Sequence, residues 1–236
     1  MAEREIKEIA LVLSSTSSGE ADRIITLLSA ERGKYRAKIK GVKKPRAKLA
    51  YASFPLNLGE YLLVKSGKNY VVTNCNYIDN FSILSQDLNK YYAACGILDI
   101  VSKTTRESEE CAGLFVATID ALRQLCYSNE NLFEVLCKYI HDVINFSGFR
   151  ITEEVGYASS KKSYFDFSTA QLTNVLSENA VELSDNEAYI LNCVINHLKV
   201  GEDKIKGIKN VLKLLIMFFE TKLDEDIEIV KKFIEG

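Results

Sequence analysis

The hydrophobic periodicity of the chain changes at about Asn80, and this change constrains the fold more than any other feature of the sequence. Before it, short runs of β-branched and aromatic residues are separated by Gly, Ser and Asn, which is typical of strands. After it, apolar residues recur every three to four positions, which is typical of amphipathic helices. The sequence therefore predicts an α+β protein with two domains, residues 1–80 and residues 81–236.

Five predicted strands fill the first domain. They cover residues 6–13, 22–28, 34–42, 56–65 and 70–78, although the second range is also compatible with a helix. The sequence Ser66-Gly67-Lys68-Asn69 predicts a hairpin turn between the last two strands. Five short strands in this length favour a small barrel, and the five-stranded OB-fold is the commonest nucleic-acid-binding form of such a barrel.

The second domain is predicted to be helical. Ser184 and Glu187 have the spacing of a capping box, in which each side chain bonds a free N–H at the start of a helix. The periodicity fades between Gly148 and Glu182, which predicts a short irregular insertion at about 148–182, with residues 164–167 as one strand of a small hairpin. The face predicted to be buried on the first helix consists of Leu88, Tyr91, Tyr92, Cys95 and Leu98.

Eight basic side chains and no acidic ones lie between Lys34 and Lys48. The side chains of a strand alternate between its two faces. A strand here would therefore carry cations on one face and Tyr35, Ala37 and Ile39 on the other. The cations of the strand are Lys34, Arg36, Lys38 and Lys40, and those of the following loop are Lys43, Lys44, Arg46 and Lys48.

The charge is unevenly distributed along the chain. Residues 1–80 contain 14 basic and 8 acidic side chains, a net charge of +6, whereas residues 81–236 contain 16 and 24, a net charge of −8. A basic stripe on a protein with a total charge of −2 indicates a surface for a polyanion, and we interpret it as a nucleic-acid interface. The alternative is an edge strand whose lysines prevent aggregation. For Tyr51, Phe54, Tyr61 and Tyr70 the predicted role is core packing.

The sequence offers little that is typical of an enzyme. Its two histidines, His141 and His197, are far apart and lack the spacing of known metal motifs. The acidic groups Glu109-Glu110, Glu153-Glu154 and Asp224-Glu225-Asp226 are interpreted as solvated surface. We therefore predict no catalytic activity, no cofactor and no metal. An enzyme with a metal site built from scattered carboxylates stays an alternative.

The sequence also predicts a cellular compartment. None of the six cysteines forms a CxxC pair, and most lie in apolar stretches, which is typical of free thiols in a reducing compartment. The charged start of the chain lacks the apolar core of a signal peptide, and no apolar stretch is long enough to span a bilayer. We expect a cytoplasmic protein without a membrane partner.

Several short motifs in residues 8–60 resemble, in order and spacing, those of the bacterial RecO recombination mediators. They are Ala10-Leu-Val-Leu13, Gly19-Glu-Ala-Asp-Arg23, Thr26-Leu-Leu28, Glu31-Arg-Gly-Lys34, Lys40-Gly-Val-Lys-Lys-Pro-Arg46, Leu49 and Phe54-Pro55-Leu56. The second half is similar in layout, with Phe146-Ser-Gly-Phe149 where the family has a leucine-glycine-aromatic step.

The resemblance implies an OB-fold followed by a helical domain. It also implies that the protein acts in DNA repair at the nucleoid and has no hydrolytic active site. It implies binding of single- and double-stranded DNA and annealing of strands coated with single-stranded-DNA-binding protein (SSB). It also implies docking of the SSB C-terminal tail and, with RecR, loading of RecA. The DNA contacts carried over by motif are Arg23, Lys34, Lys40, Lys43, Lys44 and Arg46; Arg36, Lys38 and Lys48 are added by the strand phase.

One departure from the family concerns zinc. Many members carry a four-cysteine zinc module after the glycine-aromatic step, but no cysteine lies between Cys137 and Cys193 here. We therefore expect a variant without zinc, whose small hairpin is held by packing of Tyr164, Phe165 and Phe167. An OB-type adaptor that binds RNA or protein is the alternative to the mediator function.

Overall fold

The computed structural model describes residues 5–67 and 69–235, so Lys68 of the predicted hairpin turn lies outside the described residues. The chain divides into two compact units. The first comprises Met1–Gln86 and Val101–Ile119, and the second comprises Asp87–Ile100 and Asp120–Gly236. A domain boundary at residue 80 stays a prediction.

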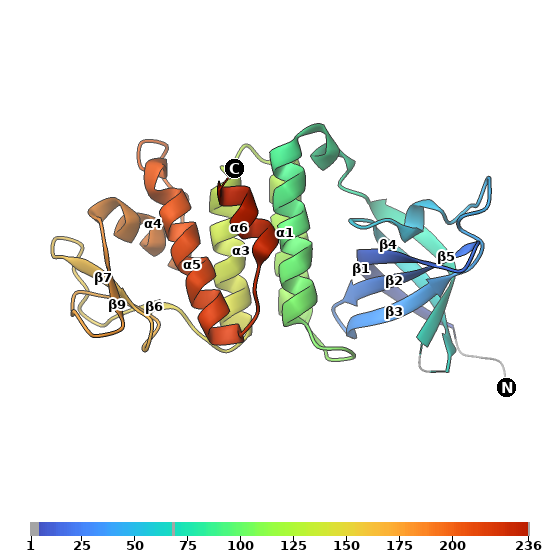
Figure 1. The fold of residues 1–236 in the computed structure, drawn as a ribbon, viewed down its shortest axis with the longest axis horizontal. Helices are drawn as coiled ribbons and strands as arrows, with labels where there is room; N and C mark the ends of the chain where they lie inside the picture. The colour runs from blue at the N-terminus through green and yellow to red at the C-terminus, as the bar shows by residue number, and fades with distance from the viewer. Residues whose placement is uncertain (1–4, 68, 236) are drawn as a thin grey trace. The chain divides into compact units, whose positions relative to one another are not determined.

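The first unit contains a closed barrel of five strands in the order β1-β2-β3-β5-β4 (Figure 1). All neighbouring pairs are antiparallel except β3 with β5. This topology confirms the predicted five-stranded barrel. The strands are β1 (Ile6–Ser18), β2 (Asp22–Ser29), β3 (Gly33–Ile39), β4 (Leu58–Ser66) and β5 (Asn69–Asp79), with the short 3₁₀ helices η1 (Tyr51–Ser53) and η2 (Ser82–Gln86) after β3 and β5.

Two strand ends differ from the prediction. The strand β1 continues to Ser18 because its Ser and Thr residues pair with β2, and a bulge between Val12 and Ser14 shifts the register. The strand β3 ends at Ile39, since Gly41 has a φ of +70° and its N–H donates to Asp22 Oδ1 at 2.8 Å. Lys40 therefore lies in the turn that follows the basic strand.

Alternation along the strands fills the barrel with apolar side chains. In β3 the residues Tyr35, Ala37 and Ile39 are at most 4% exposed, as the sequence predicted. Tyr61 is fully buried, and its hydroxyl donates to the Ala52 carbonyl at 2.9 Å and accepts from Asn57 Nδ2 at 2.8 Å. Burial of each large apolar side chain contributes roughly 1.5–3 kcal/mol, so this core fixes the outward direction of the alternating residues.

The segment after α1 (Leu88–Thr104) packs on the barrel at the start of β3. The Ser108 N–H donates to the Lys34 carbonyl at 3.1 Å. Gly33 has a φ of +58°, and a Cβ at this position would lie 2.1 Å from the Glu109 carbonyl oxygen. Only glycine satisfies both the left-handed backbone and this close approach, so the beginning of the basic strand is fixed by a distant part of the chain.

The helices of the second unit confirm the predicted helical region. The helices α3, α4 and α5 pack on one another (Figure 1). The predicted capping box is present: Ser184 accepts from the Glu187 N–H, and the Glu187 carboxylate accepts from the Ser184 N–H. After α1, the helices of the chain are α2 (Ala112–Tyr127), which begins in the first unit, α3 (Leu132–Phe146), α4 (Asp185–Ile195), η3 (Ile205–Gly207), α5 (Ile208–Leu223) and α6 (Glu228–Glu235).

The buried face of α1 differs from the predicted one. Leu88, Tyr91 and Tyr92 are 67%, 42% and 48% exposed, whereas small and branched residues face the interior. The reason is a close helix contact, because a Cβ on Gly96 would lie 2.7 Å from Val230 Cγ2 of α6. A bulky face cannot approach so closely. The buried residues of α1 in the second unit are Ala93, Ala94, Ile97, Leu98 and Ile100.

The segment 148–182 is more regular than predicted. It contains most of a four-stranded sheet in the order β6-β8-β7-β9, and α4 packs against it (Figure 1). Its strands are β6 (Thr152–Glu153), β7 (Ser163–Asp166), β8 (Gln171–Thr173) and β9 (Ala180–Leu183). Phe165 and Phe167 lie with Phe218 of α5 in an aromatic cluster whose ring centroids are 5.2 to 5.6 Å apart. This packing is the one expected for the hairpin.

Within residues 5–67 and 69–235, none of the helices combines the length and the hydrophobicity that a bilayer-spanning segment requires.

Candidate nucleic-acid interface

The basic strand presents its cations outward as the alternation predicted. Arg36 is exposed and Lys34 and Lys38 are half-buried, while the residues between them are buried. The strand β3 pairs with β2 along seven residues and with β5 at Ala37 and Lys38. It therefore has a paired strand on each side in the closed barrel, although only two of its residues pair with β5, and this weakens the edge-strand explanation of the lysines.

Residues 40–48, which we call the basic loop, are fixed by their backbone. The Lys43 N–H donates to the Ala21 carbonyl at 2.9 Å, and the side chain of Val42 is 7% exposed in the barrel core. Asp22 also holds the loop: the Gly41 N–H and the Lys38 ammonium keep the pKa of its carboxyl below the ordinary value. The basic side chains of the loop are exposed, and they are those of Lys40, Lys43, Lys44, Arg46 and Lys48.

The nine predicted DNA-binding residues are not equally available. Lys34 Nζ donates to the Ser102 carbonyl, and Lys38 Nζ lies 2.9 Å from Asp22 Oδ2. Lys43 Nζ donates to the Gly19 carbonyl at 3.2 Å. Arg23 donates to Ser53 Oγ at 3.3 Å, with its guanidinium 4.7 Å from the centre of the Phe54 ring. The residues whose side chains make no hydrogen bond or ion pair within the described part of the chain are Arg36, Lys40, Lys44, Arg46 and Lys48, although the charge of Lys40 also acts on the Asp22 carboxylate.

The register of the barrel separates these residues into two places. Arg23 pairs with Ile39, and Leu28 pairs with Lys34, so Arg23 lies beside the basic loop and Lys34 lies at the opposite end of β3. The five residue steps from Lys34 to Ile39 span about 17 Å. The structure therefore gathers Arg23, Lys38 and the basic loop at one end of the barrel and leaves Lys34 apart from them.

The aromatic residues of the barrel divide in a similar way. Tyr61 is buried and Tyr70 packs edge-on against Tyr35 at 5.3 Å, as expected for core residues. The prediction was wrong for Tyr51 and Phe54, which are 39% and 50% exposed. Tyr77 is also 55% exposed, although it belongs to the apolar run of β5 and no sequence pattern predicted its exposure.

The acidic groups considered as metal ligands are mostly engaged with protein donors. Glu153 accepts from the amide groups of Asn192 and Asn196, and Glu154 accepts from Thr173. Asp226 pairs with Lys231 at 3.0 Å. Glu109 and Glu110 are exposed. The structure thus gives the carboxylate-based enzyme no assembled site within the described residues.

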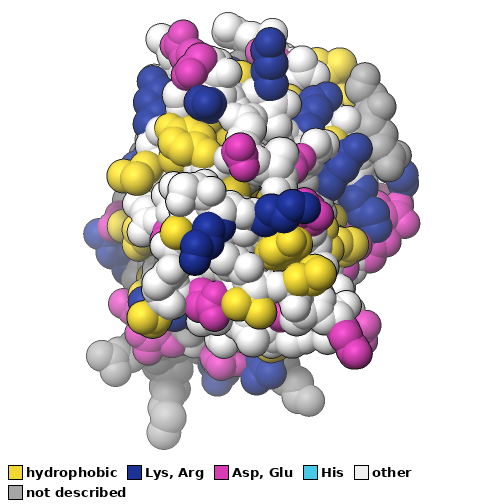
Figure 2. Space-filling view, turned by 90° about the vertical axis from the view of Figure 1, so that its left-hand side faces the viewer, with side chains coloured by type: hydrophobic (Ala, Val, Ile, Leu, Met, Phe, Trp, Pro, Cys, Tyr) yellow, Lys and Arg dark blue, Asp and Glu magenta, His cyan; other side chains and the backbone are white. Residues whose placement is uncertain are grey.

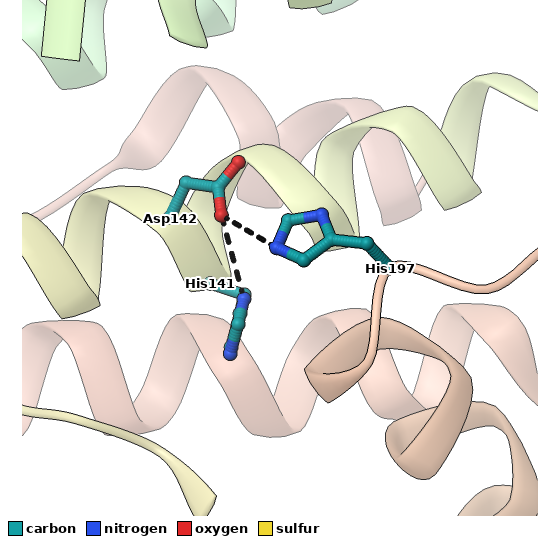
Figure 3. Close-up of side chains that lie close together, drawn as sticks. All are labelled: His141, Asp142 and His197. Atoms are coloured by element: carbon teal, nitrogen blue, oxygen red, sulfur yellow. Dashed lines mark ion pairs between the residues drawn. The ribbon is translucent and has the colours of Figure 1, made fainter. Parts of the chain in front are cut away.

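The two histidines, distant in sequence, lie together around Asp142 (Figure 3). Asp142 Oδ1 is 3.1 Å from His197 Nε2 and 3.6 Å from His141 Nδ1. Their ligand-type atoms lie within 4.8 Å of one another, a separation that a metal ion requires. No sequence motif predicts this cluster, because the loop after α4 brings His197 to α3 only in the fold.

A neighbouring amide disfavours metal binding at this cluster. The Asn145 amide oxygen accepts from the Ile151 N–H at 3.1 Å, which turns its nitrogen toward His141, 3.1 Å from Nε2. An amide nitrogen only donates, so this contact favours the tautomer in which His141 Nε2 accepts and Nδ1 carries the proton that faces Asp142. A metal ligand needs a free lone pair on that nitrogen. The arrangement is better suited to joining His197 and α3 through Asp142.

Comparison with known proteins identifies relatives along the whole chain. The family model described as Recombination protein O N terminal matches residues 1–81, and that described as Recombination protein O C terminal matches residues 85–227. The protein named DNA repair protein RecO from Acetivibrio thermocellus is 26% identical over 81% of this chain and 79% of its own length. The protein of the same name from Caldanaerobacter subterraneus subsp. tengcongensis is 21% identical over 94% of this chain and 95% of its own length. A third, from Heliobacterium modesticaldum, is 37% identical over 40% of this chain and 34% of its own length. The chain therefore belongs to the RecO family of recombination proteins.

Proposed function

We propose that this protein is a recombination mediator of DNA repair that acts at the nucleoid and binds DNA through the basic end of its barrel. The observation that carries the proposal is the basic loop, where Lys40, Lys44, Arg46 and Lys48 are exposed and make no hydrogen bond or ion pair within the described chain. The names of the relatives, all called DNA repair protein RecO, support the same biological role.

The binding mechanism follows from counterion release. Each phosphate that a lysine or arginine neutralises releases condensed cations, so affinity falls as salt rises. With about four contacts to a single strand, log K should fall against log salt with a slope of roughly −3. Such contacts position the backbone without reading the bases, so we expect similar affinity for single strands of different sequence, and binding of duplex DNA as well.

The same surface can promote annealing. Two complementary strands repel through their phosphates, and a cationic surface lowers that repulsion when both strands lie on it. Annealing by this mechanism needs no side chain that forms or breaks a covalent bond, so the proposed function includes no hydrolytic activity. We propose further that the protein anneals SSB-coated strands and, with RecR, helps to load RecA. The second unit would receive the SSB C-terminal tail.

Strand annealing tests the proposal directly. Complementary labelled oligonucleotides coated with SSB should anneal faster with the wild-type protein than without it. The variant with Lys40, Lys44, Arg46 and Lys48 changed to Ala should lose most of this acceleration. A competition between DNA and RNA of the same sequence distinguishes the alternative: preference for RNA, or no acceleration of annealing, would favour the adaptor function instead.

A further inference from the structure

We propose that a hollow beside the basic loop is a stacking site for one unpaired base of single-stranded DNA, an inference that rests on the proposed DNA-binding function. The hollow has a volume of about 560 Å³ and lies entirely on the first unit. This volume is within the range of roughly 300–1,000 Å³ typical of small-ligand sites. Its lining residues are Tyr51, Phe54, Pro55, Asn57, Tyr77 and Asn80.

The aromatic rings of the hollow are exposed and held in place. The Tyr51 hydroxyl donates to the Cys75 carbonyl at 2.5 Å, which ties η1 to β5. The Tyr77 hydroxyl donates to Asn80 Oδ1 at 3.4 Å. Phe54 is fixed from one side by the Arg23 guanidinium, 4.7 Å from its ring centre. Rings that are both exposed and fixed lose little conformational freedom when a ligand binds.

The backbone next to Phe54 is strained in a way that presents its ring to solvent. Leu56 has a φ of +68°, which is unfavourable for a branched side chain, and it is only 6% exposed. The Leu56 N–H donates to the Val12 carbonyl at 3.0 Å, and the Val12 N–H donates to the Asn57 carbonyl at 2.9 Å. This conformation buries Leu56 while Phe54 and Pro55 stay exposed. Strain of this kind persists mainly at functional sites.

The charge around the hollow favours a nucleic acid over an apolar peptide. Arg23 contacts Phe54 and lies beside the basic loop, which leads directly into η1 through residues 49 and 50. None of the lining residues is acidic. Proteins that bind single strands without sequence preference combine a cationic track for the backbone with aromatic platforms for the bases, and this end of the barrel has both.

The stacking site should make the affinity for single-stranded DNA higher than that for duplex DNA. A base within a duplex is already stacked on both faces, so its ring faces are not available to Tyr51, Phe54 or Tyr77. The hollow therefore contributes to single-strand affinity alone, whereas the basic loop contributes to both forms. Because every base has a π-face, the contribution tolerates any sequence.

A comparison of two oligonucleotides with the wild-type protein tests the site. One is a thymidine 12-mer, and the other has the same phosphates with abasic residues in place of the nucleotides. We expect about tenfold weaker binding of the abasic strand, as typical stacking energies imply. Phe54→Leu or Tyr77→Leu should reduce this ratio toward one without changing the salt slope, while Phe146→Leu, at an exposed position of the second unit, should preserve it.

A fluorescence reporter gives an independent readout, because the chain contains no tryptophan. Phe54→Trp should be quenched by the thymidine 12-mer and not by the abasic strand, whereas Phe146→Trp, at an exposed position of the second unit, should respond to neither. Equal binding of the two strands by the wild-type protein would overturn the stacking site and leave the proposed function intact. Binding of neither strand would overturn the proposed function itself.

Discussion

The two units of this protein use their charged side chains differently. In the second unit, Lys138, Lys162, Lys231 and Lys232 all pair with carboxylates at distances of 2.6 to 3.0 Å. Figure 2 shows one face of the molecule on which basic and acidic side chains are interspersed. In the basic loop of the first unit, four cations make no hydrogen bond or ion pair within the described residues.

This difference indicates where a polyanion can bind. A cation that already has a carboxylate partner gains little from a phosphate, because the phosphate must replace an existing interaction. An unpaired cation on a fixed backbone attracts a phosphate without breaking a contact, and releases counterions from the nucleic acid. The number of lysines is therefore a weaker guide to DNA binding than a dense cluster of unpaired cations with no acidic residue among them, which residues 40–48 provide.

The largest expected effect concerns the buried ion pair of the second unit. Glu134 is 1% exposed, and its Oε1 accepts from Lys138 Nζ at 2.8 Å and from the Val200 N–H at 3.0 Å. Lys138→Met leaves this carboxylate buried without its cation, which should lower the free energy of unfolding by about 3 kcal/mol. Thermal unfolding measures the loss. DNA affinity should stay unchanged.

The matched control is Lys232→Met, which removes an exposed pair with Glu228 at 2.6 Å. Exposed pairs contribute little because water screens them, so this variant should unfold close to wild type. Equal destabilisation by Lys138→Met and Lys232→Met would show that burial does not set the strength of these pairs.

An intermediate effect distinguishes Lys34 from the basic loop. Lys34 Nζ donates to the Ser102 carbonyl within the first unit. Lys34→Met should therefore lower the free energy of unfolding by about 1.5 kcal/mol, the value typical of a charged hydrogen bond, with little effect on the salt slope of DNA binding. Lys44→Met should have the opposite profile, with near wild-type stability and a salt slope reduced by about 0.7.

The same two variants can contradict the assignment. If Lys34→Met reduced the salt slope as much as Lys44→Met, Lys34 would be a DNA contact, and the motif-based prediction for this residue would be preferred to the structural one.

The smallest expected effect is a dependence on pH through Asp22. Hydrogen bonds from the Gly41 N–H and Lys38 lower the pKa of the Asp22 carboxyl. The ionised carboxylate therefore stabilises the fold at every pH above its ordinary pKa, and this contribution is lost as the pH falls through the lowered pKa. Stability should be constant between pH 8 and 5 and decrease below about pH 4. Asp22→Asn should be slightly less stable at pH 7 and show a smaller decrease in acid.

The sequence predicted those features that depend on local geometry. Alternation in β3 identified the outward cations, because a strand of any register has a period of two. The capping box at Ser184 and Glu187 was equally local. The prediction that Tyr91 and Tyr92 lie on the buried face of α1 was wrong. Both residues follow a helical period as well as Ala93 and Ile97 do, and only the contact of Gly96 with Val230 selects the small residues for the buried face.

Features that join distant residues had no signal in the sequence. The pairing of Lys34 with Ser102, the gathering of His141, Asp142 and His197, and the aromatic hollow all depend on how separate segments meet. Exposure of Phe54 was hidden for the same reason, since an aromatic residue followed by Pro55 and Leu56 is more typical of a strand that enters a core.

The central claim, that DNA binds to the unpaired cations of the basic loop, is tested most directly by fluorescence anisotropy at several salt concentrations. The comparison sets wild type against Lys40, Lys44, Arg46 and Lys48 changed together to Ala. A charge-matched control changes Lys161, Lys199, Lys204 and Lys206, which are exposed in the second unit. We predict a slope of roughly −3 for wild type and the control, and a slope near zero for the loop variant. A loop variant that kept the wild-type slope while the control lost it would contradict the account.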